Sequence, residues 1–360
     1  MTDHSPVKLD LTEESADKER EIRKEDSGPQ RAPGLRERLR KPGLLTSSLC
    51  LLALLIFQIP IAIVIIIVFG AKDAFVDDTA VMVTGTATNL LFAALVVRYL
   101  FGRESSSVIG ARGIHLVHLL LLLLMALPLT VVASEIGNLS AEVFAVGEWF
   151  EIFQDFAERP WIVVFFCGCV LPGLGEELLF RGYLGRGLVA RWGLFMGVLW
   201  TSLLFGLIHG HPSHAIPAFF LGVVLHLIYL STKSIVAPIL LHIANNALAF
   251  GLAKRADLVP VRGYNVLEEG GILHTPILLI LSALLTTLAL GALYYQTRVR
   301  WITPDGKTWS PGYVSAEKPP VELDATARAS SARPIAVIVT AVAYILFSAV
   351  LVQEVMGSPH

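Results

Sequence analysis

The sequence from Leu44 to Phe69, LLTSSLCLLALLIFQIPIAIVIIIVF, contains no charged residue. An α-helix rises 1.5 Å per residue, so about 20 apolar residues cross the ~30 Å hydrocarbon core of a bilayer, and this stretch is longer than that. It also far exceeds the apolar core of a cleavable signal peptide, roughly 7–15 residues. The stretch therefore predicts an uncleaved membrane-anchoring helix.

Apolar stretches of spanning length recur along the chain. Hydrophobic residues make up 54% of the sequence and charged residues 16%, whereas soluble domains average about 45–50% and about 25%. We therefore expect an all-α, polytopic transmembrane bundle of about eight or nine hydrophobic helices. The predicted spans are 44–69, 80–101, 115–134, 161–187, 193–209, 214–231, 235–253, 272–295 and 334–352.

The remaining segments are polar. Residues 1–42 mix acids, bases, Pro and Gly without apolar periodicity, a composition typical of a disordered charged tail. Residues 297–333 are rich in Pro, Ser and charge and predict a polar loop. The expected divisions are this cytoplasmic tail, N-terminal transmembrane helices (43–159), a catalytic core (160–253) and C-terminal transmembrane helices with their polar loop (254–360).

The distribution of charged residues indicates how the chain is oriented in the membrane, but it does not indicate a binding partner. The formal net charge is -2, which gives no indication of nucleic-acid binding. The odd number of cysteines, all within apolar runs (Cys50, Cys167 and Cys169), argues against a disulfide framework. Basic residues at 36–41 precede the first span and predict a cytoplasmic N-terminus. Lys254, Arg255 and Arg262 oppose this orientation, because alternation of the spans places them outside.

The span 161–187 contains charges that a bilayer disfavours. Each ionisable residue in a span costs roughly 2.5–3.5 kcal/mol on insertion scales, so such residues mark function by default. In Gly175-Glu-Glu-Leu-Leu-Phe-Arg181, Glu177 and Arg181 are four residues apart and share a helix face, so this pair can neutralise itself. Glu176 points about 100° away, and a carboxylate without such a partner suits a general base.

Two later spans carry polar residues at the same helical spacing. Phe205 and His209 lie four residues apart in the fifth span, and His242 and Asn246 lie four apart in the seventh. Counted from the predicted cytoplasmic turns, these residues reach depths compatible with one shared cavity. Asn245 could replace Asn246, and Phe205 could shape the cavity by packing alone.

These motifs in this order, Glu-Glu-x-x-x-Arg, Phe-x-x-x-His and His-x-x-x-Asn on successive apolar helices, closely resemble the CPBP family. This family comprises the CAAX proteases and bacteriocin-processing enzymes, also called the Abi intramembrane proteases. The resemblance covers about residues 161–251 and implies an intramembrane endopeptidase. It implies that Glu176 and His209 activate a water, that His242 and Asn246 stabilise the oxyanion, and that Glu177 and Arg181 hold the first motif together.

The same resemblance leaves the cofactor open. Glu176, His209 and His242 would make a three-ligand zinc site with an open position, but the His-Glu-x-x-His spacing of zincins is absent, so metal-free Glu/His catalysis is an equal alternative. The expected substrate is a prenylated CAAX protein, a peptide precursor or another membrane-protein segment. The expected location is a bacterial-type plasma membrane, with the lipid bilayer as the surrounding partner.

Two other classes of function fit the same residues. A catalytically idle scaffold, immunity or regulatory protein could use the same fold. A proton-coupled transporter also places charges at the midplane of the bilayer, but the sequence has no inverted repeat or paired broken helices.

Overall fold

The computed structural model describes residues 34–69, 78–144, 149–255, 274–297, 299–302, 308–309, 328–329 and 334–357. The chain divides into two compact units, Met1–Arg38 and Leu39–His360. In the first unit only residues 34–38 are described, and they form most of helix α2 (Leu35–Leu39). The rest of the predicted tail, apart from residues 39–42 in the second unit, lies outside the described residues.

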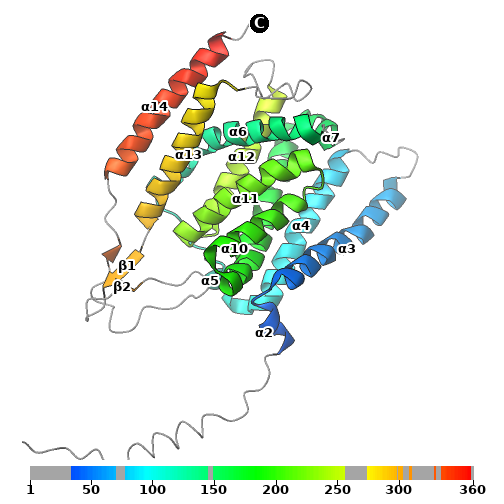
Figure 1. Cartoon of the computed structure of the whole chain (residues 1–360). Helices are drawn as coiled ribbons and strands as arrows, with labels where there is room; N and C mark the ends of the chain where they lie inside the picture. The colour runs from blue at the N-terminus through cyan, green and yellow to red at the C-terminus, as the bar shows by residue number, and fades with distance from the viewer. Residues whose placement is uncertain are drawn as a thin grey trace, which may run out of the picture. The chain divides into compact units, whose positions relative to one another are not determined.

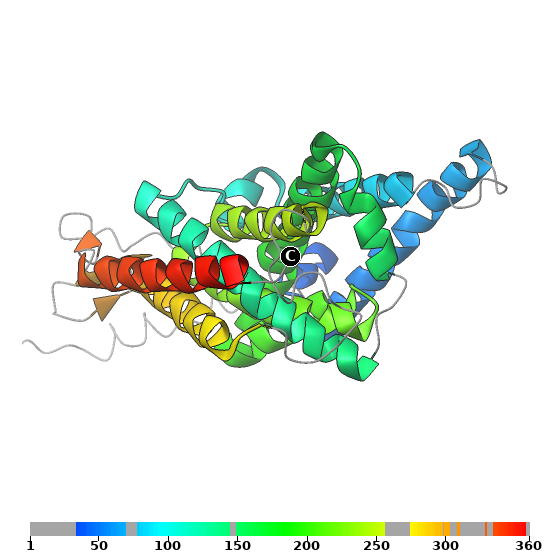
Figure 2. The same ribbon diagram turned by 90° about the horizontal axis from the view of Figure 1, so that it is seen from above.

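The second unit is a helical bundle, as predicted. Its helices are α3 (Leu44–Phe69), α4 (Asp78–Phe101), α5 (Ser105–Val108), α6 (Leu116–Phe144), α7 (Trp149–Ala157), α8 (Trp161–Val163), α9 (Leu171–Leu179), α10 (Gly185–Leu207), α11 (Pro212–Thr232), α12 (Val236–Lys254), α13 (Pro276–Thr297) and α14 (Pro334–Gly357). Three short helical segments join them: η1 (Gly102–Glu104), η2 (Val164–Val170) and η3 (Phe180–Leu184). Figures 1 and 2 show α13 and α14 side by side, on the opposite side of the bundle from α3.

Length and apolarity qualify seven described stretches as membrane spans. One of them, Trp161–Leu207, is 47 residues long and contains the predicted span 161–187 and most of the predicted span 193–209. Gly193 divides them, because its φ of 77° and ψ of 179° interrupt the helical path inside α10. A shorter apolar stretch, Ile338–Gln353, lies in α14. The prediction of about eight or nine hydrophobic helices is therefore confirmed.

Two segments outside the predicted spans contain secondary structure. α7 lies in the acidic stretch before residue 160, where Phe153 stacks on Phe250 of α12 at 4.5 Å between ring centroids and Phe156 is fully buried. The polar loop 297–333 contains three short antiparallel strands in the order β2 (Thr308–Trp309), β1 (Val299–Ile302) and β3 (Arg328–Ala329). The predicted polar loop therefore contains short strands at these residues.

The end of the predicted tail also differs from expectation. Leu39 accepts a hydrogen bond of 3.0 Å from the Tyr183 hydroxyl, and the Arg40 Nε donates to the Leu100 carbonyl at 2.9 Å. Residues 39 and 40 are therefore attached to the bundle, and the prediction of disorder up to residue 42 was wrong for them. Cys50, Cys167 and Cys169 are free thiols.

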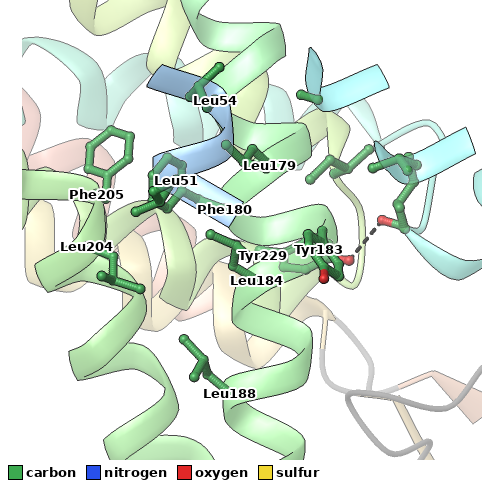
Figure 3. Packing of buried hydrophobic residues seen from close by; sticks show 14 of the residues in the cluster. Leu51, Leu54, Leu179, Phe180, Tyr183, Leu184, Leu188, Leu204, Phe205 and Tyr229 are labelled. Atoms are coloured by element: carbon green, nitrogen blue, oxygen red, sulfur yellow. Dashed lines mark hydrogen bonds between the residues drawn. The ribbon is translucent and has the colours of Figure 1, made fainter. Parts of the chain in front are cut away.

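The largest apolar cluster joins the first helices to the helices that carry the motifs. Figure 3 shows Leu51 and Leu54 of α3 with Leu179, Phe180 and Leu184, and the cluster extends to Phe205 of α10. Burial of an aliphatic or aromatic side chain contributes roughly 1.5–3 kcal/mol where it is removed from water. Within a bilayer the corresponding benefit is close packing, and this packing fixes the positions of the motif helices.

Candidate active site

Helix α9, which carries the first motif, is held between two other helices by close backbone contact. A Cβ atom at Gly173 would lie 2.7 Å from the Ile243 side chain of α12. A Cβ atom at Gly175 would lie 2.9 Å from the backbone of Leu90 in α4. Small residues allow membrane helices to approach in this way. The two glycines therefore bring Glu176 and Glu177 between α4 and α12.

Glu177 lies at the centre of a buried ionic cluster. Its Oε1 accepts hydrogen bonds from Arg181 Nη1 at 2.6 Å and from His242 Nδ1 at 2.9 Å, and neither Glu177 nor Arg181 is exposed at all. The predicted pairing of Glu177 with Arg181 is thus confirmed. Because an ionised carboxylate only accepts hydrogen bonds, Nδ1 of His242 carries a proton. The bond to His242 joins the first motif to the third.

Arg181 is held from two further directions. Its Nη2 donates to the Gly222 carbonyl of α11 at 2.8 Å, and its guanidinium carbon lies 4.5 Å from the centroid of the Phe205 ring. η3, which contains Arg181, is a π-helical segment, a rare local widening that is frequent at functional sites. The guanidinium therefore connects the first motif to α10 and α11 as well as to Glu177.

Glu176 has a different environment from its neighbour. Its side chain is 12% exposed, and Oε2 lies 3.8 Å from Nε2 of His242, too far for a hydrogen bond. No described residue forms a hydrogen bond with Glu176 Oε2. The two adjacent acids thus differ in burial and bonding: Glu177 is fully buried and accepts two hydrogen bonds through Oε1, whereas Glu176 is partly exposed and accepts neither of these bonds.

His209 is fixed at the end of α10 by its own helix and by two rings. Its Nδ1 lies 2.8 Å from the Phe205 carbonyl, which can only accept, so Nδ1 donates this hydrogen bond and Nε2 is the ring nitrogen that the bond does not use. The His209 ring lies 5.1 Å from the Phe205 ring and 4.5 Å from the His214 ring, between centroids. Phe205 also lies 5.9 Å from the His242 ring, so it packs between the two histidines.

The two asparagines of the third motif bond to different helices. Asn246 donates from Nδ2 to the Gly168 carbonyl of η2 at 3.2 Å, whereas Asn245 accepts from the Thr130 hydroxyl of α6 at 3.1 Å. An amide nitrogen has two N–H groups, so Asn246 retains a donor beyond this bond. Asn245 instead connects α12 to α6.

The zinc site of Glu176, His209 and His242 stays one of two alternatives for the cofactor. Within the described part of the chain, no three His, Cys, Asp or Glu side chains are grouped so that they could hold a metal ion. Glu176, His209 and His242 do not meet this condition as they lie. We therefore derive no chemical step through a metal.

Sequence reasoning missed the bond between Glu177 and His242, the packing of His214 on His209, and the role of Thr130. The bond between Glu177 and His242 could have been expected from the sequence, because two acids and one arginine leave one negative charge that a buried site must balance. The contacts of His214 and Thr130 depend on helix rotation, which motif spacing does not give.

Comparisons with known proteins cover this part of the chain. Residues 158–248 match the family described as "Type II CAAX prenyl endopeptidase Rce1-like". The chain is 28% identical over 131 residues to the Bacillus subtilis (strain 168) protein named "Putative membrane peptidase YdiL", a match that covers 36% of this chain and 52% of the relative. The chain thus spans about half the length of that curated relative. No solved structure matches this chain.

The matched segment runs from just before α8 into α12 and contains all three motifs. It also contains every bond that joins Glu177, Arg181, His242 and Phe205. Residues 158–248 therefore have the pattern of Rce1-like CAAX prenyl endopeptidases, and the resemblance to the CPBP family is confirmed.

Proposed function

We propose that the protein is an intramembrane endopeptidase in which Glu176 and His209 activate a water for attack on a peptide bond. The observation that carries the proposal is the contrast between two adjacent acids. Glu177 is fully buried and its Oε1 is bound by Arg181 and His242, whereas the Glu176 side chain is 12% exposed and its Oε2 lies 3.8 Å from Nε2 of His242, beyond hydrogen-bond distance. A general base has to be reached by the water that it deprotonates, which favours the partly exposed acid of the two.

The proposed reaction begins with proton transfer from water to Glu176. The water oxygen bonds to the carbonyl carbon, and the carbonyl oxygen becomes an oxyanion. Glu176 then gives the proton to the leaving nitrogen as the C–N bond breaks. His209 accepts a hydrogen bond from the same water through Nε2, because its Nδ1 is held by the Phe205 carbonyl.

His242 and Asn246 are the proposed oxyanion donors. Since Nδ1 of His242 donates to Glu177, a second donor at Nε2 requires a doubly protonated ring. Donors aimed at an oxyanion are each worth roughly 10²–10³-fold in rate.

The proposed substrate is a peptide segment that enters the membrane, with a prenylated CAAX sequence as the first candidate because the matched family is described by that activity. The proposed orientation places the N-terminus in the cytoplasm of a bacterial-type cell. The one group of basic residues against this orientation includes Lys254, whose amine donates to the Ala157 and Arg159 carbonyls at 2.9 and 2.8 Å. A lysine bound within the protein is a weak topology signal.

The test uses purified protein in liposomes and a quenched fluorescent peptide that contains a farnesylated cysteine followed by three residues. Wild type should cleave the probe, and Glu176→Ala and His209→Ala should each reduce the rate by about 10²–10⁴-fold, as expected for a lost general base or its partner. Glu158→Ala is the matched control, since Glu158 is an exposed acid of the same segment. Full cleavage by Glu176→Ala protein would refute the proposal.

A further inference from the structure

Asn89 of α4 is a buried polar residue that the proposed chemistry does not use. Its side chain is 9% exposed, and no described residue forms a hydrogen bond with its Oδ1. A buried polar atom without a partner costs about 1–3 kcal/mol, so such an atom requires an explanation. Packing alone would favour an apolar residue of similar shape at this position.

The position of Asn89 links it to the first motif. α4 touches α9 at Gly175, where a Cβ atom would lie 2.9 Å from Leu90 and 3.3 Å from the carbonyl carbon of Asn89. Gly175 directly precedes Glu176. Asn89 therefore lies on the helix that borders the proposed general base, with its backbone in contact with the glycine that precedes that base.

The neighbouring acids show the same deficit of donors. Glu176 Oε2 and Glu177 Oε2 are, like Asn89 Oδ1, buried atoms that accept no hydrogen bond from the described residues. All three are acceptors, so the group that would satisfy them has to supply donors. An extended peptide supplies a backbone N–H at every residue except proline, and inside a bilayer each N–H needs an acceptor.

We propose that Asn89 is a substrate-binding residue whose side-chain oxygen accepts a hydrogen bond from a backbone N–H of the substrate beside the scissile bond. The inference rests on the proposed function. It adds a residue that binds a backbone N–H of the substrate, whereas His242 and Asn246 bind the carbonyl oxygen. α4 lies outside residues 158–248, so the family match does not assign this role.

The test compares Asn89→Leu with Thr86→Val in the liposome assay with the farnesylated probe. Thr86 is the matched control, because it lies one turn earlier on α4 and its hydroxyl bonds to the Met82 and Val83 carbonyls of the same helix at 2.8 and 3.3 Å. Asn89→Leu should lower kcat/KM by about 10-fold or more, the effect of one lost hydrogen bond with its partner left unsatisfied. Its unfolding temperature should stay the same or rise, since an unsatisfied polar atom is removed. Thr86→Val should keep the wild-type kcat/KM, and Asn89→Ser, which retains an acceptor oxygen, should recover part of the loss.

A second set of probes replaces each amide N–H that flanks the scissile bond, one at a time, by an ester oxygen. With wild-type protein, one of these ester probes should have a kcat/KM lower than that of the parent probe, by the same factor as Asn89→Leu lowers kcat/KM for the parent probe. With that same ester probe, Asn89→Leu and wild type should have equal kcat/KM. Equal kcat/KM for Asn89→Leu and Thr86→Val would overturn the inference, as would a rate loss that follows a lowered unfolding temperature. If wild-type protein does not cleave the parent probe, the proposed function is refuted. If wild type and Asn89→Leu cleave it at the same rate, only the role of Asn89 is refuted.

Discussion

Among the described residues, two buried clusters that pair a glutamate with a histidine differ in how their carboxylates are bound. In the first, Glu177 binds Arg181 and His242, and the adjacent Glu176 retains an oxygen without a hydrogen bond to the described residues. In the second, Glu135 of α6 accepts from the Asn138 side chain and from the backbone N–H of His274, both at 3.2 Å. Ser134, beside Glu135, lies 2.8 Å from Nε2 of His274.

The difference separates a reactive arrangement from a structural one. The second cluster lies outside residues 158–248 and joins the C-terminal half of α6 to His274, which precedes α13. Its carboxylate oxygen is occupied by donors from within the protein, so it can hold two helices together without binding a ligand. In the first cluster, Glu177 holds helices together, and Glu176 is the proposed general base. Changes in the first cluster should therefore affect activity, and changes in the second should affect stability alone.

The largest expected effect comes from Arg181→Ala. Removal of one partner of a buried ion pair typically costs about 3–5 kcal/mol, because the other charge remains buried without compensation. Cleavage should be lost together with stability, measured as the unfolding temperature in detergent. Arg181→Lys keeps the charge but loses the fork that bonds Glu177 and the Gly222 carbonyl at once, so it should fall between Ala and wild type. Wild-type stability in Arg181→Ala protein would show that the cluster is not structural.

The next effect tests the second cluster. Glu135→Ala leaves the Asn138 amide and the His274 backbone N–H without their acceptor, which should cost about 1–3 kcal/mol of stability. Once corrected for the amount of folded protein, cleavage of the probe should equal that of wild type. A selective loss of kcat in folded Glu135→Ala protein would contradict the division between the two clusters.

A smaller effect should appear with pH. Burial lowers the pKa of His274 below its ordinary value of 6.5, and Glu135 opposes this shift. Below pH 6.5 the unfolded state then binds more protons than the folded state, so stability should fall on acidification from 6.5 towards the lowered value. His274→Gln should reduce this acid sensitivity in thermal unfolding measured at pH 7 and pH 5. An unchanged difference between the two pH values would contradict the prediction.

The smallest effect lies outside both clusters, in the turn between α11 and α12. Lys233 has a left-handed backbone with φ of 54°, and its pKa is lowered to about 8 by burial and by the nearby Arg186 and Arg112. Lys233→Gly removes the repelled charge and suits the left-handed conformation, so it should stabilise the protein by about 1 kcal/mol. In wild type, stability should rise as the pH increases from about 8 to 10.5, because the unfolded state binds more protons there; the variant should lack this rise. A lower unfolding temperature for Lys233→Gly would be the contrary result.

The spans could be predicted because length and apolarity are local properties of the sequence. Leu44–Phe69 coincides with α3, and the spans separated at Gly193 lie on either side of an interruption in α10. α7 was missed because its acids, including Glu151 and Asp155, hide an apolar face that packs on Phe250. The strands in 297–333 were missed because they are two to four residues long, too short for a periodic pattern.

The site could be predicted in part for a related reason. Spacing along one helix gave the pair of Glu177 and Arg181, because residues four apart share a face. The bond from Glu177 to His242 joins residues 65 positions apart and depends on how α9 and α12 rotate against each other. Such contacts follow from packing at Gly173 and Gly175, which the sequence alone does not specify.

The most direct test of the central claim is comparative membrane proteomics of cells that contain wild type, Glu176→Ala or Glu135→Ala protein at equal membrane levels. The account predicts that one or more membrane peptides or proteins accumulate uncut with Glu176→Ala, while wild type and Glu135→Ala yield the cut form. An identical set of cut and uncut species for wild type and Glu176→Ala would contradict it.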